Sequence, residues 1–246
     1  MPRIRAAERL IIALDVPHDL KNPDAMIDVD DARVLVKMLG ETASFLKIGW
    51  PLYMAGGNVL IKEFVDQGRR VFLDLKFGDI AETVKRLVHV AVRDRVEFIT
   101  VHTSSDAIRA AVEAAKGSEL KILTVTVLTS LDASDLEEMG EKVSVRDLVL
   151  RKARLAQEVG CQGIIASGKE AAAVRDQAGP DFLIVIPGIR PAGASHEDHK
   201  RAVTPGDAIR AGADYLVVGR PIARASDPRE AALKIIAEMQ EAFDSR

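Results

Sequence analysis

Eight short apolar runs, separated by longer amphipathic segments, limit more than any other feature how this chain can fold. The segments between the runs carry apolar residues at helical spacing among strong helix formers, as in "AETVKRLVHVAVRDR" (81–95). Strands that alternate with helices pair in parallel, and eight such units in 246 residues predict one (β/α)8 barrel of the TIM-barrel type, with residues 1–246 as a single domain. The predicted strands are residues 10–16, 45–50, 71–76, 98–102, 121–128, 163–167, 183–189 and 215–220.

An open, doubly wound sheet is the alternative architecture for the same alternation. Its dinucleotide-binding form has a Gly-x-Gly-x-x-Gly turn after the first strand, and no such turn follows residues 10–16. The closed barrel is therefore preferred, and in a barrel the active site is expected at the carboxyl ends of the strands.

The overall charge and the cysteine content argue against several classes of function. A formal net charge of −3 gives no electrostatic reason to expect binding to nucleic acid or to an anionic membrane. No stretch approaches the roughly 20 apolar residues of a membrane-spanning helix, and the first residues do not read as a signal peptide. The single cysteine, Cys161, suits a reducing compartment. We therefore expect a soluble, cytoplasmic protein.

Ionisable side chains occur at the carboxyl ends of the first three predicted strands. Alternate residues of a strand share one face, so Asp74 and Lys76 are in phase with Phe72 and point into the barrel. The same rule directs Asp15 and Lys47 inward from the first two strands. A purely structural ion-pair network is the alternative. Because buried ion pairs are poor sources of stability, four such groups from three strands indicate a functional site.

The last two predicted strands end in glycine–arginine elements. "IPGIR" places Gly188 and Arg190 after the seventh strand, and "VVGRPI" places Gly219 and Arg220 after the eighth. Barrels often bind phosphate here, because glycine lets the backbone approach closely and arginine can hold the anion with two hydrogen bonds. We therefore predict phosphate binding, and we expect the long polar loop 190–205 to be an active-site lid.

The segment Asp74-x-Lys76-x-x-Asp79-Ile80-x-x-Thr83 resembles the signature of the orotidine 5′-phosphate decarboxylase family. Five further segments resemble the same family in the same order, so that the resemblance covers nearly the whole chain. They are "ALDV" (13–16), "LKIG" (46–49), "VTVLTS" (125–130), "PGIRPAG" (187–193) and "ADYLVVGRPI" (213–222). The resemblance implies decarboxylation of orotidine 5′-monophosphate to uridine 5′-monophosphate in de novo pyrimidine biosynthesis, without a cofactor.

The resemblance also implies a role for each charged residue at the predicted mouth. Lys76 is expected to be the general acid that protonates C6 of the pyrimidine as carbon dioxide leaves. Asp74 is expected beside the substrate carboxylate, and Lys47 is expected to pair with Asp74 and the ribose. Asp15 is expected to bind the ribose hydroxyls, and Asp79 is expected in the same catalytic network.

Further implied roles concern assembly and recognition of the pyrimidine. In this family the residues at the positions of Asp79 and Thr83 reach across a homodimer interface into the partner's site, so each site would be composite. Thr129 and Ser130 lie where the family contacts the pyrimidine ring, and the resemblance does not decide which of the two makes the contact.

The resemblance assigns the phosphate to the end of the chain and to the loop before it. Arg220, with Gly219 and the neighbourhood of Arg190, is expected to hold the 5′-phosphate. The family is expected to carry a glutamine in the lid that bridges phosphate and pyrimidine, where this chain has His199. Imidazole can also donate a hydrogen bond, so we hypothesise that His199 keeps the bridging role.

A magnesium-dependent sugar-phosphate decarboxylase or lyase of the same barrel group is the alternative function. Its members resemble this chain at the motif of Asp74 and Lys76, but they carry an acidic residue where this chain has Lys47, and they use magnesium. With lysine at that position we expect no metal site and no other cofactor.

Overall fold

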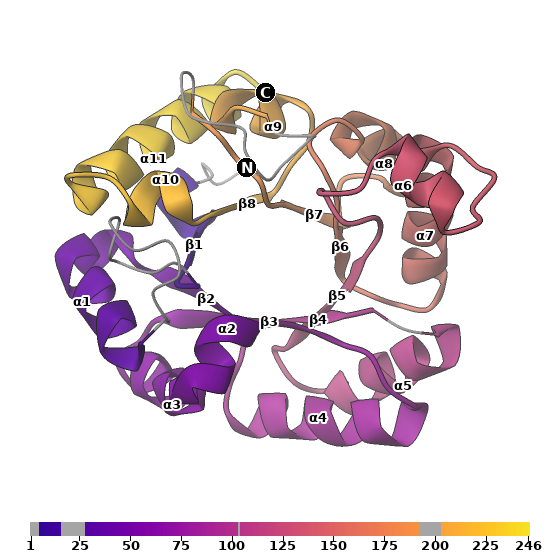
Figure 1. Ribbon diagram of the computed structural model, residues 1–246, viewed down its shortest axis with the longest axis horizontal. Coiled ribbons are helices and arrows are strands. Elements are labelled where there is room, and N and C mark those ends of the chain that lie inside the picture. Colours follow the sequence, from indigo (N-terminus) through magenta and orange to yellow (C-terminus); the bar gives the residue numbers. More distant parts are fainter. Residues whose placement is uncertain (1–4, 16–27, 103, 192–202) are drawn as a thin grey trace.

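The alternating strands and helices form a closed parallel barrel. The computed structural model describes residues 5–15, 28–102, 104–191 and 203–246. Its eight strands pair in chain order, and the last pairs with the first (Figure 1). They are β1 (Leu10–Ala13), β2 (Phe45–Gly49), β3 (Arg70–Phe77), β4 (Phe98–Val101), β5 (Lys121–Val125), β6 (Gly163–Ile165), β7 (Leu183–Ile186) and β8 (Tyr215–Val218). The predicted fold class is confirmed.

Helices surround the barrel (Figure 1). Several begin at a side chain that accepts a hydrogen bond from the first turn, as Ser144 does from the backbone N–H of Asp147; such caps satisfy N–H groups that have no partner inside the helix. The α-helices are α1 (Val29–Leu39), α2 (Trp50–Leu52), α3 (Asn58–Asp66), α4 (Ala81–Arg93), α5 (Ser105–Ala115), α6 (Ala133–Glu138), α7 (Val145–Glu158), α8 (Ala171–Ala178), α9 (Pro205–Arg210), α10 (Arg220–Ala223) and α11 (Pro228–Asp244). Short 3-10 turns are η1 (Ala6–Glu8) and η2 (Gly40–Thr42), and η3 (Tyr53–Gly57) is a π-helical turn.

Apolar side chains form two layers, one inside the barrel and one between the strands and the helices. Phe72 belongs to the inner layer, whereas Leu73 and Leu75 belong to the outer one, which confirms the alternation predicted for this strand. In the inner layer the rings of Phe45 and Phe98 meet edge to face, with centroids 5.0 Å apart. The inner layer consists of Ile11, Ala13, Phe45, Phe72, Phe98, Leu123, Val185, Tyr215 and Val217.

An ionic cluster covers the amino-terminal end of the inner layer. The guanidinium of Arg70, the first residue of β3, lies 4.0 Å from the centroid of the Phe45 ring. Its Nε and Nη2 atoms each donate a hydrogen bond of 2.5 Å to the carboxylate of Glu97. Nη2 also lies 3.3 Å from the hydroxyl oxygen of Tyr215. With this end covered, the opposite end of the barrel remains for a ligand.

Several strands end before the predicted boundaries. The first ends at Ala13, the fifth at Val125 and the seventh at Ile186. The next residues, such as Leu14 and Val127, lie beyond the strand ends and are still buried, which explains their apolar character. One backbone hydrogen bond to the neighbouring strand still follows each of β1 and β5, from Leu14 to Lys47 at 3.0 Å and from Thr126 to Ile165 at 3.2 Å, before the chain leaves the sheet. These strand ends lead into the loops that carry the candidate site.

The two ends of the predicted lid loop 190–205 lie together. Ile189 and Val203 form a parallel bridge, and the backbone N–H of Arg190 donates to the carbonyl oxygen of Val203 at 3.0 Å. Residues 192–202 lie outside the described ranges, so the lid remains a prediction.

Candidate active site

Four charged side chains meet at the carboxyl ends of β1, β2 and β3, and their charges alternate. The Lys47 ammonium contacts the Asp15 carboxylate, and its Nζ lies 3.7 Å from Oδ2 of Asp74. The other oxygen of Asp74, Oδ1, accepts a hydrogen bond from Nζ of Lys76 at 3.0 Å. The structure thus brings together the four residues that the strand alternation directs inward, in the order Asp15, Lys47, Asp74 and Lys76.

The position of Asp15 depends on a glycine. Oδ1 of Asp15 accepts a hydrogen bond from the backbone N–H of Gly49 at 2.6 Å. A Cβ atom at Gly49 would lie 2.7 Å from Oδ2 of Asp15, closer than non-bonded atoms approach. Glycine at the end of β2 therefore allows the Asp15 carboxylate to lie against Lys47.

The network keeps its buried members charged. Burial would raise the pKa of the Asp74 carboxyl, but the ammonium groups of Lys47 and Lys76 outweigh it and hold that pKa below its ordinary value. Burial would lower the pKa of Lys47, but the carboxylates of Asp15 and Asp74 reverse the effect and raise the pKa. At neutral pH Asp74 is therefore an anion and Lys47 a cation.

Lys76 lies on an irregular stretch of β3. The pairing of β3 with β4 shifts between Leu73 and Phe77, and Lys76 has a φ of +47°. Residues other than glycine rarely adopt this left-handed conformation, and such strain concentrates at functional sites. The Lys76 side chain is 36% exposed, against 17% for Asp74 and 11% for Lys47. Lys76 is thus more accessible than the two residues behind it.

A cavity of about 240 Å³ opens beside this network. Lys47, Asp74 and Lys76 line one part of it. Thr129 and Ser130, from the turn after β5, line another. The apolar lining consists mainly of Phe72, Val125, Val127, Ile165, Pro187 and Val217. Apolar walls with a few convergent polar groups are typical of small-molecule sites.

The predicted phosphate residues follow β7 and β8 as the sequence indicates. Arg220 is the first residue of α10, directly after Gly219. Gly188 has a φ of +74°, which favours glycine. Arg190 is 7% exposed, and its Nη1 donates to the carbonyl oxygen of Ile189 at 2.9 Å. The guanidinium of Arg190 is thus buried and bonded to the backbone of the preceding residue. His199 lies outside the described residues.

Asp79 and Thr83 occupy a different part of the molecule from the 240 Å³ cavity. Asp79 follows β3, and its Oδ1 accepts a hydrogen bond from the backbone N–H of Ile80 at 2.7 Å. It lines a groove of about 590 Å³ on the outside of the barrel, together with Trp50 and Tyr53. Thr83 lies in the first turn of α4. Within the described part of one chain, Asp79 is therefore not among the residues that line the cavity of Lys76.

Two residues near the network were not singled out from the sequence. Thr100 of β4 is fully buried, and its Oγ1 lies 2.9 Å from Oδ1 of Asp74. The available signal was its phase with Phe98, which directs it into the barrel. Lys152 of α7 donates from Nζ to the carbonyl oxygen of Thr126 at 2.8 Å and so fixes the chain that leads to the cavity. No strand alternation points to Lys152.

His102 lies after β4, at the mouth, as expected from its position at the end of the predicted strand. Partial burial lowers the pKa of its imidazole, and the positive charges of Lys152 and Lys76 lower it further. The imidazole is therefore neutral at physiological pH and adds no charge to the network.

The described ranges carry neither a metal-binding cluster nor a membrane-spanning helix. They contain no group of three or more histidine, cysteine, aspartate or glutamate side chains arranged to hold a metal ion. None of their helices combines the length and the apolar content that crossing a membrane requires.

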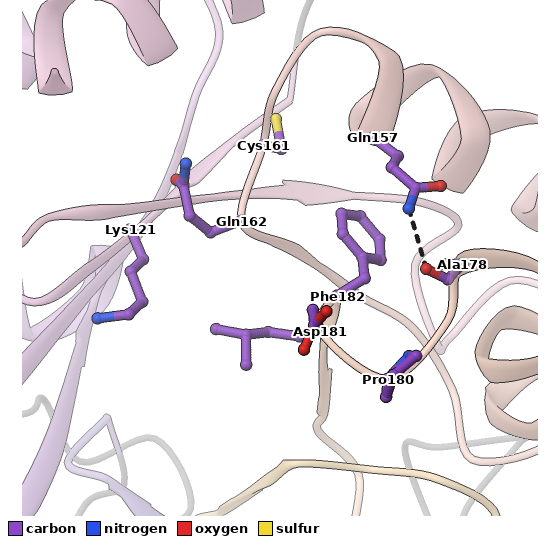
Figure 2. A pocket seen from close by; sticks show the side chains of 9 residues that line it. Lys121, Gln157, Cys161, Gln162, Ala178, Pro180, Asp181 and Phe182 are labelled. Carbon is purple, nitrogen blue, oxygen red and sulfur yellow. Dashed lines mark hydrogen bonds between the residues drawn. The ribbon is translucent and has the colours of Figure 1, made fainter.

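Another cavity, of about 420 Å³, lies at the amino-terminal ends of β5 and β7 (Figure 2). Its polar side chains serve the fold, since Nε2 of Gln157 donates to the carbonyl oxygen of Ala178 at 2.9 Å. Oε1 of Gln162 accepts from the backbone N–H of Ile122 at 2.8 Å. Burial raises the pKa of the Cys161 thiol to about 12, so it is not a nucleophile at neutral pH. The 240 Å³ cavity at the carboxyl ends of the strands is therefore the better candidate for the active site.

Comparison with known proteins finds one family over nearly the whole chain. The profile of the orotidine 5′-phosphate decarboxylase / HUMPS family matches residues 8–235. Orotidine 5′-phosphate decarboxylase of Nitrobacter winogradskyi is 48% identical over 238 residues, which cover 97% of this chain and 95% of that protein. The enzyme of the same name from Caulobacter sp. (strain K31) is 47% identical, over 95% of this chain and 98% of that one.

Two solved structures are similar to this chain over nearly its whole length. The crystal structure of orotidine 5′-phosphate decarboxylase from Lactobacillus acidophilus is similar to this chain with a TM-score of 0.77 and 34% identity, covering 94% of this chain and 98% of that one. An uncharacterized conserved protein from Geobacillus kaustophilus has the same TM-score at 30% identity, covering 94% and 99%.

Proposed function

Because the chain belongs to the orotidine 5′-phosphate decarboxylase / HUMPS family, we propose that it converts orotidine 5′-monophosphate to uridine 5′-monophosphate in pyrimidine biosynthesis. Relatives that bear the name of this carboxy-lyase match it over nearly its whole length. The observation that carries the proposal is the alternating network of Asp15, Lys47, Asp74 and Lys76 beside a cavity. The single cysteine fits a cytoplasmic location.

Lys76 is the proposed proton donor. The bond between C6 and the substrate carboxylate breaks, carbon dioxide leaves, and the electron pair stays on C6. An sp² carbanion of this kind has no delocalising electron sink, so its charge must be stabilised by nearby positive groups. The Lys76 ammonium supplies that charge and then its proton to C6, and water returns a proton to the amine. Its accessibility at the end of the network supports this role.

Asp74 is proposed to act both on Lys76 and on the substrate carboxylate. Its carboxylate is ionised, because Lys47 and Lys76 hold its pKa low. It accepts a charge-assisted hydrogen bond from the Lys76 ammonium at 3.0 Å and so holds that group in place. The same negative charge would lie close to the substrate carboxylate, and the repulsion between them is relieved when carbon dioxide leaves.

The other predicted residues are proposed to bind the nucleotide. Thr129 and Ser130 would meet the pyrimidine, because they line the same cavity as Lys47 and Lys76. Lys47 and Asp15, which contacts it, would meet the ribose. The 5′-phosphate would be held by Gly219, Arg220, the neighbourhood of Arg190, and His199 of the lid. Binding energy from the phosphate, far from the breaking bond, can offset the cost of closing the site.

We also propose that the outer groove is covered by a second copy of the chain. Trp50, Met54 and Ile80 are large apolar residues exposed in this region, and exposed apolar clusters mark interaction surfaces. Asp79 lines the same groove. A partner docked there would bring Asp79 and Thr83 of each chain toward the other's cavity, so that each site is completed by both chains.

The test is the absorbance change of orotidine 5′-monophosphate on addition of the purified protein, with a chelator present throughout. The proposal predicts conversion to uridine 5′-monophosphate at an undiminished rate in chelator. If orotidine 5′-monophosphate is not converted, and sugar phosphates are turned over with magnesium instead, the alternative of a magnesium-dependent decarboxylase or lyase replaces it.

A further inference from the structure

The irregular stretch of β3 faces a single residue of β4. Leu73 pairs with Ile99 and Phe77 pairs with Val101, so the three residues 74–76 lie opposite Thr100 alone. A bulge of this kind removes backbone partners from the ladder and re-aims side chains. The backbone of Lys76 therefore needs another source of support than regular pairing with β4.

Thr100 supplies that support through its hydroxyl. Oγ1 of Thr100 accepts a hydrogen bond from the backbone N–H of Lys76 at 2.8 Å. Because the oxygen accepts there, its own proton is directed to Oδ1 of Asp74, 2.9 Å away. Thr100 is fully buried, so water does not compete for these two bonds. One hydroxyl thus joins the backbone of one charged residue to the side chain of the other.

The outer side of the bulge is held as well. The indole Nε1 of Trp50 donates to the carbonyl oxygen of Leu75 at 2.7 Å. The bulge is therefore anchored from the inner face by Thr100 and from the outer face by Trp50. A left-handed residue such as Lys76, with a φ of +47°, persists only where its surroundings hold it in this way.

We propose that Thr100 is a positioning residue for the reaction: its hydroxyl holds the bulge so that the Lys76 ammonium and the Asp74 carboxylate keep a fixed relation to the substrate. The inference rests on the proposed decarboxylase function. It assigns no chemical step to Thr100. Oδ1 of Asp74 accepts from both Lys76 and Thr100, so loss of the hydroxyl frees the carboxylate to rotate and the strained backbone to relax.

The test compares three variants in the steady-state assay with orotidine 5′-monophosphate. Thr100→Val keeps the shape and removes the hydroxyl, and Thr100→Ser keeps the hydroxyl. Thr124→Val is the matched control, because Thr124 is a buried threonine of the neighbouring strand β5 outside the cavity lining. Displacement of catalytic groups lowers kcat by up to about 100-fold. Thr100→Val is thus expected to lose roughly 30- to 100-fold in kcat with KM changed less than about threefold.

The inference attributes the loss in kcat to the missing hydroxyl. The kcat of Thr100→Ser is therefore expected to stay within about fivefold of wild type, and that of Thr124→Val within about twofold. A Thr100→Val enzyme within about twofold of wild type in kcat would overturn the inference. So would an equal loss in Thr100→Ser and Thr100→Val. If Thr100→Val does not fold, Thr100→Ala replaces it, with the same loss in kcat expected and the same result overturning the inference. Absence of turnover by wild type would instead reject the proposed function itself.

Discussion

The Nζ atom of Lys47 lies between two carboxylates, in contact with Asp15 and 3.7 Å from Oδ2 of Asp74. A buried lysine is costly unless it is paired, and here each partner carboxylate is also buried for most of its surface. The arrangement leaves Lys76, at the end of the series, as the member most open to the cavity. The network therefore presents one cation to a ligand and neutralises the other internally.

Acid should weaken the contribution of Asp74 to stability. The folded pKa of Asp74 lies below its ordinary value of 3.8, so its ionised form stabilises the fold above about pH 4 and that stability is lost as the pH falls through the folded pKa. We expect Asp74→Asn to lower the free energy of unfolding by a constant amount between about pH 5 and 8, and by less below pH 3.8. Urea denaturation at several pH values measures this. A difference that grows in acid would contradict it.

The amino-terminal ionic cluster should support stability and not turnover. Arg70→Met removes the guanidinium from Phe45 and leaves the partly buried carboxylate of Glu97 without its closest cation. Losing one partner of such a pair costs about 3–5 kcal/mol when it is buried, so about 2–3 kcal/mol is expected here. Urea denaturation gives the loss, and kcat should change little. A stability equal to that of wild type would show that the cluster is incidental.

A charge placed on the outer groove should separate the proposed dimer. Met54 follows the groove residue Tyr53 in the chain and is 74% exposed. Met139, which follows α6, is 67% exposed and is not among the residues that line the groove, so Met139→Glu is a matched control for Met54→Glu. We expect Met54→Glu to shift the protein to monomer and to lower its activity at low protein concentration, because desolvating a carboxylate in an apolar interface is unfavourable. Sedimentation velocity measures the assembly. Equal behaviour of the two variants would argue against this groove as the interface.

If each active site is built from both chains, dimers that combine two different inactive variants should regain activity. Lys76→Ala and Asp79→Ala each inactivate a homodimer if Asp79 acts in the partner's site. A mixed dimer then has one site with both changes and one site with neither. Subunit exchange between the two inactive proteins is expected to restore about a quarter of wild-type activity per chain. If activity does not return although exchange is complete, Asp79 does not act across the interface.

Much of the fold and part of the candidate site could be predicted from the sequence. The alternation of side chains along a strand was enough to direct Asp15, Lys47 and Asp74 to one mouth, because β1, β2 and the first part of β3 pair regularly. Strand ends were less predictable. Leu14 and Val127 are buried beyond the ends of β1 and β5, and the sequence does not distinguish a buried residue after a strand from one within it.

The bulge at Lys76 could not be predicted. It depends on which residues of β3 and β4 pair, a property of two segments that no single stretch encodes. The phase of Thr100 with Phe98 directs it into the barrel, but its hydrogen bond to the backbone of Lys76 depends on the bulge and could not be predicted. Asp79 belongs to the same sequence motif as Lys76, yet it lines the outer groove, because the chain turns outward after Phe77.

The rate of the Lys76→Ala variant at saturating orotidine 5′-monophosphate tests the central claim most directly. Lys234→Ala is the control, since Lys234 is an exposed lysine paired with Glu230 on α11. General acid catalysis contributes up to about 10⁴-fold, so the account predicts a loss of at least roughly 10³-fold in kcat for Lys76→Ala, with binding of uridine 5′-monophosphate retained. A Lys76→Ala enzyme within about tenfold of wild type would contradict it.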